Sequence, residues 1–322
     1  MFLLKRKKPD IDEETIEKPI RRKRKKTEPT KPWGKLERVI VFIFLISAPI
    51  FSIFFFVHSK DTKIPKVLSD SISRTPPNTG ELKTILEREL QNLTGTYGIW
   101  IQSLDNSFSL GMNEKQEFEG ASLFKLPLMI GYFEEIDKGK LDPNTKYTLK
   151  YSDGATGAGI LATLPPGTAI TYHDVVETMG KSSDNTAFQI MTNILEPNKE
   201  ETVINEIGMT NTNFTNSKTT PYDIGLLFYK LNNTNLLSSN SKEELLNFLK
   251  KTDFENLIPS SLPNNIKVAH KYADINNSLN DAGIIYTNKP YVLVILSKDV
   301  NSDEAQIEFS KISKIVYDWT TK

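Results

Sequence analysis

Ser122 and Lys125 are residues whose types and spacing could do chemistry together. They lie in the run Gly-Ala-Ser-Leu-Phe-Lys-Leu-Pro at residues 120–127. On a helix, residues three apart share one face with their Cβ atoms roughly 5–6 Å apart, so the Lys125 amine can reach the Ser122 hydroxyl. Burial disfavours the ammonium form of a lysine, which can then accept the serine proton. The pair predicts a nucleophilic serine that forms an acyl-enzyme.

The helix that carries this pair is predicted to be buried. Residues 123–133 are apolar nearly all round, which is typical of a helix at the centre of a domain. Its first N–H groups are free to stabilise a developing oxyanion. A simpler interpretation stays open, in which Ser122 caps the helix and Lys125 extends into solvent. Ser-x-x-Lys alone is too short a motif to decide between the two.

A second motif, Ser183-Asp184-Asn185, follows about sixty residues later. Taken alone it predicts only a helix start, because Ser and Asp favour N-caps and turns. Together with Ser122 and Lys125, however, it resembles the penicillin-recognising serine hydrolases, above all the class A β-lactamases, whose motif set is Ser-x-x-Lys, Ser-Asp-Asn and Lys-Thr-Gly. The resemblance continues in order and spacing from about Glu81 to the C-terminus. It includes residues 135–141, 166–168, 208–209, 219–221 and 280–286.

The pattern of apolar residues agrees with the fold that this resemblance implies. Strands at both ends of the domain, with helices between them, predict an antiparallel sheet covered by the terminal helices. The expected fold is therefore α/β of the α+β type: a five-stranded antiparallel sheet flanked by terminal helices, plus an all-helical subdomain over about residues 118–255, β-lactamase/transpeptidase-like. The expected elements are a helix over 81–93, a strand over 97–101 with a hairpin at 105–106, strands over 266–272, 283–287 and 291–297, and a final helix whose apolar face is Ala305, Phe309, Ile312, Val316 and Trp319.

The resemblance also implies roles for the residues of the first two motifs. Lys125 would deprotonate Ser122, which would attack the carbonyl of a β-lactam or of a D-Ala-D-Ala-like peptide end of the cell wall. Ser183 would pass a proton to the leaving nitrogen. Asn185 would hold the substrate amide. Ser122, Lys125 and Ser183 are the candidate catalytic residues of a serine hydrolase.

The third motif departs from the family pattern. Residues 271–273 read Lys-Tyr-Ala on a probable strand, where the family has Lys-Thr-Gly or Lys-Ser-Gly. Lys271 keeps the positive charge for the substrate carboxylate, and Tyr272 stands where the family places a hydroxyl residue that contacts it. Both are candidate substrate-binding residues. Tyr272 either points out of the cleft or narrows it, and the methyl group of Ala273 limits the approach of a ligand to the backbone.

A second departure concerns the release of the acyl group. Class A enzymes carry a glutamate on a long loop after the Ser-Asp-Asn helix, and it activates the deacylating water. Here no acidic residue lies between Glu206 and Asp223, and Glu196, Glu200 and Glu201 are expected on a solvated face. We expect slow deacylation, with Lys125 acting again as base. The alternatives are an efficient β-lactamase with an unrecognised base and a non-catalytic cell-wall peptide sensor or scaffold.

Other chemistries find less support in the sequence. The chain has no cysteine, which excludes thiol nucleophiles and disulfides. His58, His173 and His270 lack the spacing of metal ligands, so neither a metal nor a cofactor is predicted. A Ser-His-Asp triad stays open, because its members can be far apart in a chain. The glycine cluster at residues 154–159 predicts a flexible loop beside the cleft.

The N-terminal region predicts a membrane anchor. Residues 39–57 carry no charge, and about nineteen residues at 1.5 Å each span roughly 28 Å, enough for a bilayer core. The basic run at 21–26 precedes them and marks the cytoplasmic side. A cleaved signal peptide is the alternative, but the apolar stretch is long and no small-x-small site follows it. The predicted parts are a cytoplasmic tail (1–38), a transmembrane helix (39–58), a linker (59–80) and an extracytoplasmic hydrolase domain (81–322).

Charge is divided in the same way. Of the chain's 40 basic and 40 acidic residues, 14 and 7 fall in residues 1–38, which leaves 26 and 33 for the rest. Topology or attraction to anionic lipid headgroups accounts for the basic tail, and the acidic remainder argues against nucleic-acid binding. The expected location is the cell membrane, in a Gram-positive envelope. Protein partners are not predicted.

Overall fold

The computed structural model describes residues 78–322. The predicted tail, transmembrane helix and linker lie in residues 1–77, outside the described residues, and stay predictions except at the linker's end. There the first described helix, α2, begins at Thr79 with Asn78 as its N-cap, two residues earlier than expected. Within residues 78–322, no helix is both long and apolar enough to cross a membrane.

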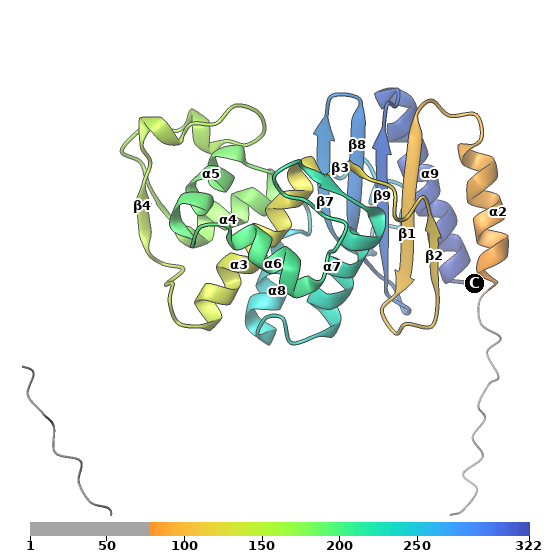
Figure 1. Ribbon diagram of the computed structural model, residues 1–322, viewed down its shortest axis with the longest axis horizontal. Helices are drawn as coiled ribbons and strands as arrows, with labels where there is room; N and C mark the ends of the chain where they lie inside the picture. The colour runs from red at the N-terminus through yellow and green to blue at the C-terminus, as the bar shows by residue number, and fades with distance from the viewer. Residues whose placement is uncertain (1–77) are drawn as a thin grey trace, which may run out of the picture. The chain divides into compact units, whose positions relative to one another are not determined.

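The centre of the fold is one antiparallel sheet of five strands in the order β2-β1-β9-β8-β7. Helices α2 and α9 lie on one side of it, and the helical part lies on the other (Figure 1). The predicted fold is confirmed. The strands are β1 (Thr96–Ser103), β2 (Ser109–Met112), β7 (Lys267–Ile275), β8 (Ser278–Tyr286) and β9 (Tyr291–Lys298), and the flanking helices are α2 (Thr79–Leu90) and α9 (Ser302–Thr320).

Strand β9 is buried on both faces, which explains its nearly continuous apolar sequence. Leu293 and Ile295 belong to the core under α9, whereas Val292 and Val294 belong to the core shared with the helical part. Of the predicted apolar face of the final helix, Ala305, Phe309, Ile312 and Val316 are fully buried, and Trp319 packs against them as a partly buried residue. The sheet thus separates two hydrophobic cores.

The helical part is built around α3, in which every residue from Lys125 to Glu135 is buried. Helices α4, α5, α6 and α8 pack around it, as the predicted central position requires. The helices are α3 (Lys125–Asp137), α4 (Tyr172–Lys181), α5 (Asn185–Ile194), α6 (Lys199–Ile207), α7 (Pro221–Asn233) and α8 (Ser239–Phe248). Two short two-stranded sheets accompany these helices. In one, β3 (Phe118–Glu119) pairs with β6 (Lys218–Thr219), and in the other β4 (Lys146–Thr148) pairs with β5 (Ala169–Thr171).

Strand β8 is longer than predicted, because its first half is polar yet buried. It begins at Ser278 instead of residue 283. Asn280 donates to the Glu119 carbonyl at 2.8 Å and accepts from the Ser297 N–H at 3.0 Å. Because the Asn280 side chain is hydrogen-bonded inside the protein, it can lie in an inner strand without the cost of an unpaired buried polar group.

The expectation of a solvated face at Glu200 was wrong. Its segment is helix α6, which packs on α3, and Glu200 is only 3 % exposed. The Thr192 hydroxyl donates to its carboxylate at 3.2 Å. Glu196 and Glu201 are exposed, as expected.

Candidate active site

The turn before α3 holds Ser122 in a strained backbone. Residues Ala121–Phe124 form one 3-10 turn, labelled η1, and Ala121 has a φ of 43°, an unfavourable value for a residue with a Cβ. Such strain often occurs at functional sites. The Ser122 side chain is partly exposed, and the Lys125 amine lies 2.9 Å from its hydroxyl oxygen. The contact expected from their spacing is present.

Lys125 is surrounded by oxygen atoms although it is only 4 % exposed. Its Nζ lies 2.8 Å from the Ser183 carbonyl, 3.2 Å from the Ser183 hydroxyl and 2.7 Å from the Asn185 side-chain oxygen, in addition to Ser122. Burial lowers the pKa of Lys125 to about 8, although the Asp184 carboxylate acts in the opposite direction. About one tenth of this amine is therefore neutral at pH 7. A neutral amine can accept a proton from a neighbouring hydroxyl.

Ser183 lies between two buried lysines. Its hydroxyl is 3.2 Å from the Lys125 Nζ and 2.8 Å from the Lys271 Nζ. Its backbone has a φ of 53°, a second strained position in the site. Burial, with the positive charge of Lys125 as a smaller cause, holds the pKa of Lys271 well below its usual range. Ser183 is therefore placed to pass a proton between the two amines and a bound group.

The Ser183-Asp184-Asn185 turn also holds the glycine-containing loop at 154–161. Asp184 caps α5 and accepts the N–H groups of Ile160 and Leu161 at 2.7 and 2.8 Å. The Asn185 side chain donates to the Thr156 carbonyl at 2.7 Å. A Cβ on Gly159 would lie 2.2 Å from the Asp184 Cγ. Glycine is therefore required for the loop to lie this close to the turn, beside the site as expected.

Tyr272 is not gathered with the other five candidate residues. Its ring stacks on Phe254 with centroids 4.5 Å apart, and its hydroxyl donates to Asp274 at 3.1 Å. Successive side chains of a strand point to opposite faces, so Tyr272 points away from the face on which Lys271 meets Ser183. Of the two predicted positions, the structure places Tyr272 out of the cleft.

His270, the strand residue before Lys271, is held between two carboxylates that the sequence did not predict as its partners. It is fully buried, and its ring nitrogens lie 2.8 Å from Asp281 and 3.3 Å from Glu255. Burial opposes its charge, but the two carboxylates raise the pKa of His270 to about 9. Among residues 78–322, no serine side chain hydrogen-bonds to this ring, whose third partner is the Thr252 hydroxyl at 3.2 Å, so His270 forms no Ser-His-Asp triad with a described serine. The alternation of side chains along β7 and the acidic Asp281 on β8 are the sequence features that could have indicated these contacts.

His173 belongs to a different group at the surface. Ligand atoms of His173, Asp174 and Glu177 lie within 4.8 Å of one another. However, the two ring nitrogens already face Asp174 at 3.2 Å and Glu244 at 2.9 Å. The group is therefore a set of salt-bridged side chains in the first turns of α4.

The connection between α6 and α7, residues 208–220, contains an aromatic residue where a carboxylate was sought. Phe214 lies in it, with its ring centroid 5.4 Å from that of Phe124 and 6.5 Å from that of Phe188. Phe124 directly precedes Lys125, and Phe188 lies on α5. Residues 208–220 contain no Asp or Glu. The connection therefore offers no acid that could activate water.

Comparison with known proteins agrees with this geometry. A model of the Beta-lactamase enzyme family matches residues 81–320. The chain belongs to this family. It is similar to β-lactamase VEB-1 of Pseudomonas aeruginosa, with 25 % identity over 272 residues, 75 % of this chain and 91 % of the relative. The predicted recognition is confirmed, and the protein is a serine hydrolase of the β-lactamase superfamily.

Solved structures place the chain close to penicillin-binding relatives of the same fold. PBP-A superposes with a TM-score of 0.69 at 26 % identity, over 75 % of this chain and 96 % of PBP-A. A variant of PBP-A, solved as its acyl-enzyme complex with penicillin G, gives 0.68 at 26 % identity over the same shares of the two chains. Both lie in the penicillin-recognising group that the motifs indicated.

Proposed function

We propose that this family member is a membrane-anchored serine hydrolase that forms an acyl-enzyme with β-lactams or with D-Ala-D-Ala-like cell-wall peptides and releases the acyl group slowly. The observation that carries the proposal is the 2.9 Å contact between the Lys125 amine, which is only 4 % exposed, and the partly exposed Ser122 hydroxyl. An activated serine needs a base within hydrogen-bond reach, and the buried amine supplies it.

Acylation follows from the order of the contacts. Neutral Lys125 takes the proton of Ser122, and the serine oxygen bonds to the substrate carbonyl carbon. The carbon–nitrogen bond then breaks. Ser183 gives its proton to the leaving nitrogen and regains one from the Lys125 ammonium, 3.2 Å away. Lys125 ends the step neutral. Lys271, 2.8 Å from Ser183, becomes the ammonium partner of the substrate carboxylate, because an adjacent anion favours the charged form.

Slow release is supported by the connection between α6 and α7. Because residues 208–220 carry no carboxylate, Lys125 is the base available beside the ester oxygen of Ser122. The acyl-enzyme of the PBP-A variant with penicillin G supports the first half of the cycle in a relative at 26 % identity. Efficient hydrolysis by an unrecognised base remains the alternative. Tyr272 and Ala273 favour neither slow nor efficient release of the acyl group.

The anchor is the second part of the proposal. Residues 39–58 hold the hydrolase domain at the outer surface of the cell membrane, with residues 1–38 in the cytoplasm. Support comes from the uncharged stretch and from the basic residues before it. The test is separation of membranes from the soluble fraction, followed by protease treatment of intact cells. An anchored protein sediments with membranes and loses residues 81–322 to the protease.

A fluorescent penicillin tests the chemistry. We expect stable covalent labelling of the wild-type protein and none of Ser122→Ala. Ser302→Ala, a substitution of an exposed serine at the start of α9, is the matched control and should label normally. Transient labelling with turnover would favour the efficient β-lactamase. No labelling of any variant would favour the peptide sensor.

A further inference from the structure

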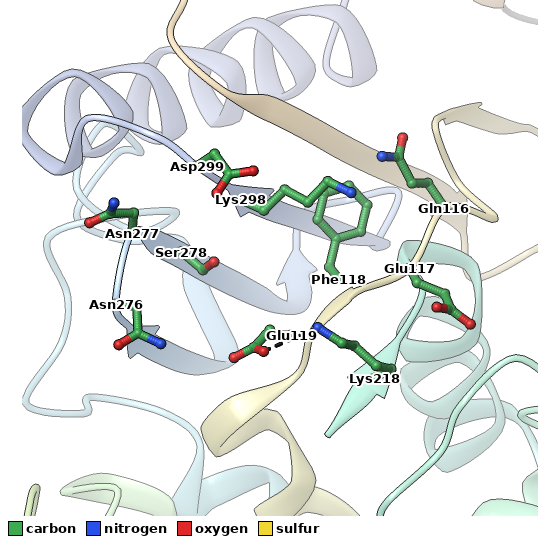
Figure 2. A pocket seen from close by; sticks show the side chains of 10 residues that line it. All are labelled: Gln116, Glu117, Phe118, Glu119, Lys218, Asn276, Asn277, Ser278, Lys298 and Asp299. Atoms are coloured by element: carbon green, nitrogen blue, oxygen red, sulfur yellow. Dashed lines mark hydrogen bonds and ion pairs between the residues drawn. The ribbon is translucent and has the colours of Figure 1, made fainter. Parts of the chain in front are cut away.

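The segment that leads to the nucleophile is held from two sides. On one side it forms β3, which pairs with β6, and the Glu119 carboxylate forms an ion pair with Lys218 of β6 at 3.1 Å (Figure 2). On the other side, the Asn280 side chain on β8 donates to the Glu119 carbonyl at 2.8 Å. Glu119 lies three residues before Ser122. Two separate elements therefore fix the backbone that enters the nucleophile turn.

The peptide unit between Glu119 and Gly120 has both of its polar groups bound. Its carbonyl accepts from Asn280, and its N–H donates to the Ser217 carbonyl at 2.9 Å. Because a peptide unit is planar, this one cannot rotate without breaking a hydrogen bond. The next carbonyl, that of Gly120, accepts the Leu123 N–H at 2.9 Å and closes the turn η1. The fixed peptide is thus the base on which the turn is built.

The fixed peptide directly precedes the strained residue of the turn. Ala121 has a φ of 43°, and a strained backbone persists where the surrounding structure leaves it no relaxed alternative. Free rotation of the preceding peptide would let Ala121 return to a favourable φ. Ser122 would then move with it, away from the Lys125 amine that now lies 2.9 Å from its hydroxyl. The contact that activates the serine therefore depends on the bound peptide.

Asn280 is a polar residue at a position where the sheet itself would accept an apolar one. It is fully buried on β8, which lies between β7 and β9. A buried amide is costly unless both its oxygen and its nitrogen are bound. Its oxygen accepts the Ser297 N–H within the sheet at 3.0 Å, whereas its nitrogen reaches out of the sheet to Glu119. The second bond favours a role at the nucleophile turn.

We propose that Asn280 is a positioning residue for acylation: its amide, together with the Ser217 carbonyl, holds the backbone before Ala121 so that Ser122 stays within reach of Lys125. The inference rests on the proposed function, because it concerns the same nucleophile. Asn280 acts through the backbone and not on the substrate. Its loss should therefore slow bond formation and leave binding of the β-lactam nearly unchanged, since the substrate-binding side chains lie on other elements.

The test compares Asn280→Leu with Ser297→Ala in the full-length protein. Asn280→Leu keeps a branched side chain and removes both hydrogen bonds of the amide. Ser297→Ala is the matched control in the neighbouring strand, because it removes a buried hydroxyl that bonds to the backbone of Leu279 at 2.6 and 3.0 Å and does not contact Glu119. Both variants lose buried hydrogen bonds of the sheet. Asn280→Leu alone releases the nucleophile segment.

Stopped-flow acylation by a fluorescent penicillin at several concentrations separates the dissociation constant from the acylation rate constant. We expect Asn280→Leu to lower the rate constant by roughly ten- to hundredfold, because a small displacement of a reacting group is enough for such a loss. The dissociation constant should stay within about twofold. Ser297→Ala should keep both constants within about twofold. If Asn280→Leu does not fold, as judged by circular dichroism, Asn280→Ala takes its place.

Hydrogen exchange provides a readout that needs no chemistry. The Gly120 and Leu123 amides, which donate to the Ser217 and Gly120 carbonyls, should exchange about tenfold faster in the Asn280 variant relative to amides of the central strands. In Ser297→Ala that ratio should not change. Exchange thus tests whether Asn280 holds the turn, independently of any reaction with penicillin.

The outcomes separate this inference from the proposed function. An Asn280 variant that acylates within about twofold of wild type overturns the inference. An equal loss of rate in Ser297→Ala, or loss of folding in both Asn280 variants, also overturns it, because Asn280 would then serve stability alone. If wild-type protein does not react with penicillin, the hydrolase falls. Faster exchange of the two turn amides would then still assign Asn280 to holding the turn, and unchanged exchange would overturn that assignment too.

Discussion

The rate of acylation should rise with pH through about 8, because the pKa of Lys125 is lowered from 10.5 to about 8. The perturbation is pH itself, varied from 6 to 9.5 at constant ionic strength. Only the neutral amine can take the proton of Ser122. A group whose pKa is lowered by burial gains its neutral form earlier as pH rises. The sign of the effect is therefore a rate that increases with pH.

The magnitude follows from the neutral fraction of the amine. With a pKa of about 8, about one tenth of Lys125 is neutral at pH 7 and about nine tenths at pH 9. The acylation rate constant should therefore increase about tenfold between these values. An exposed lysine with its usual pKa would be neutral in less than about one molecule in a thousand at pH 7. Burial thus raises the amount of base at neutral pH by roughly two to three orders of magnitude.

The assay is stopped-flow acylation by a chromogenic or fluorescent β-lactam, with the second-order rate constant plotted against pH. Lys271→Gln provides the control, because Lys271 is the other buried amine beside Ser183. It should lower the rate at every pH and keep the rise. A flat profile, or a midpoint near 6.5, would contradict the assignment of Lys125 as the base. A rise that disappears in Lys271→Gln would transfer that role to Lys271.

Three further predictions concern the groups that support the site. Because the pKa of His270 is raised from 6.5 to about 9, its contribution to the free energy of unfolding, about 3 kcal/mol, should be complete below pH 6.5 and lost as pH rises through about 9, as urea unfolding at several pH values can measure. Lys199→Met should cost about 1.5–3 kcal/mol in the same assay, because it removes the buried amine that hydrogen-bonds to Glu134 and Glu135 and leaves these carboxylates paired only with the exposed Lys138 and Lys140; Lys314→Met, at an exposed pair, should cost less than about 1 kcal/mol. Gly159→Ala should slow penicillin labelling, whereas Gly167→Ala, which has open space around it, should leave the rate within about twofold, and equal rates would contradict the loop contact.

Much of the fold could be predicted because its elements follow simple patterns of burial. The last helix repeats apolar residues at helical spacing, and four of the five predicted positions are fully buried. The nucleophile helix is apolar all round and is indeed central. The first half of β8 escaped prediction because Asn280 and Asp281 lack the composition of a strand. Their hydrogen bonds to distant residues make burial possible, and such partners are not visible in a local pattern.

The site could be predicted as a set of residues but not as an arrangement. Spacing was enough for the contact between Ser122 and Lys125, which are one helical turn apart. The meeting of Ser183 with Lys271 depends on residues 88 positions apart and required the family resemblance. Tyr272 could not be placed from sequence, because its direction depends on Phe254, which stacks on it from another segment. The partners of His270 were missed for the same reason.

The connection between α6 and α7 carries no acid, so the two halves of the proposed reaction share one base. Phe214 lies there among other phenylalanines, so this side of the nucleophile turn carries an apolar surface where a water-activating acid was sought. A water molecule that attacks the ester must then lose its proton to a group already present at Ser122. Lys125 meets that requirement, because it is neutral again once Ser183 has delivered its proton to the leaving nitrogen. In the proposed reaction, one buried amine therefore serves both steps, and we expect the ester to persist because this amine must also orient the attacking water.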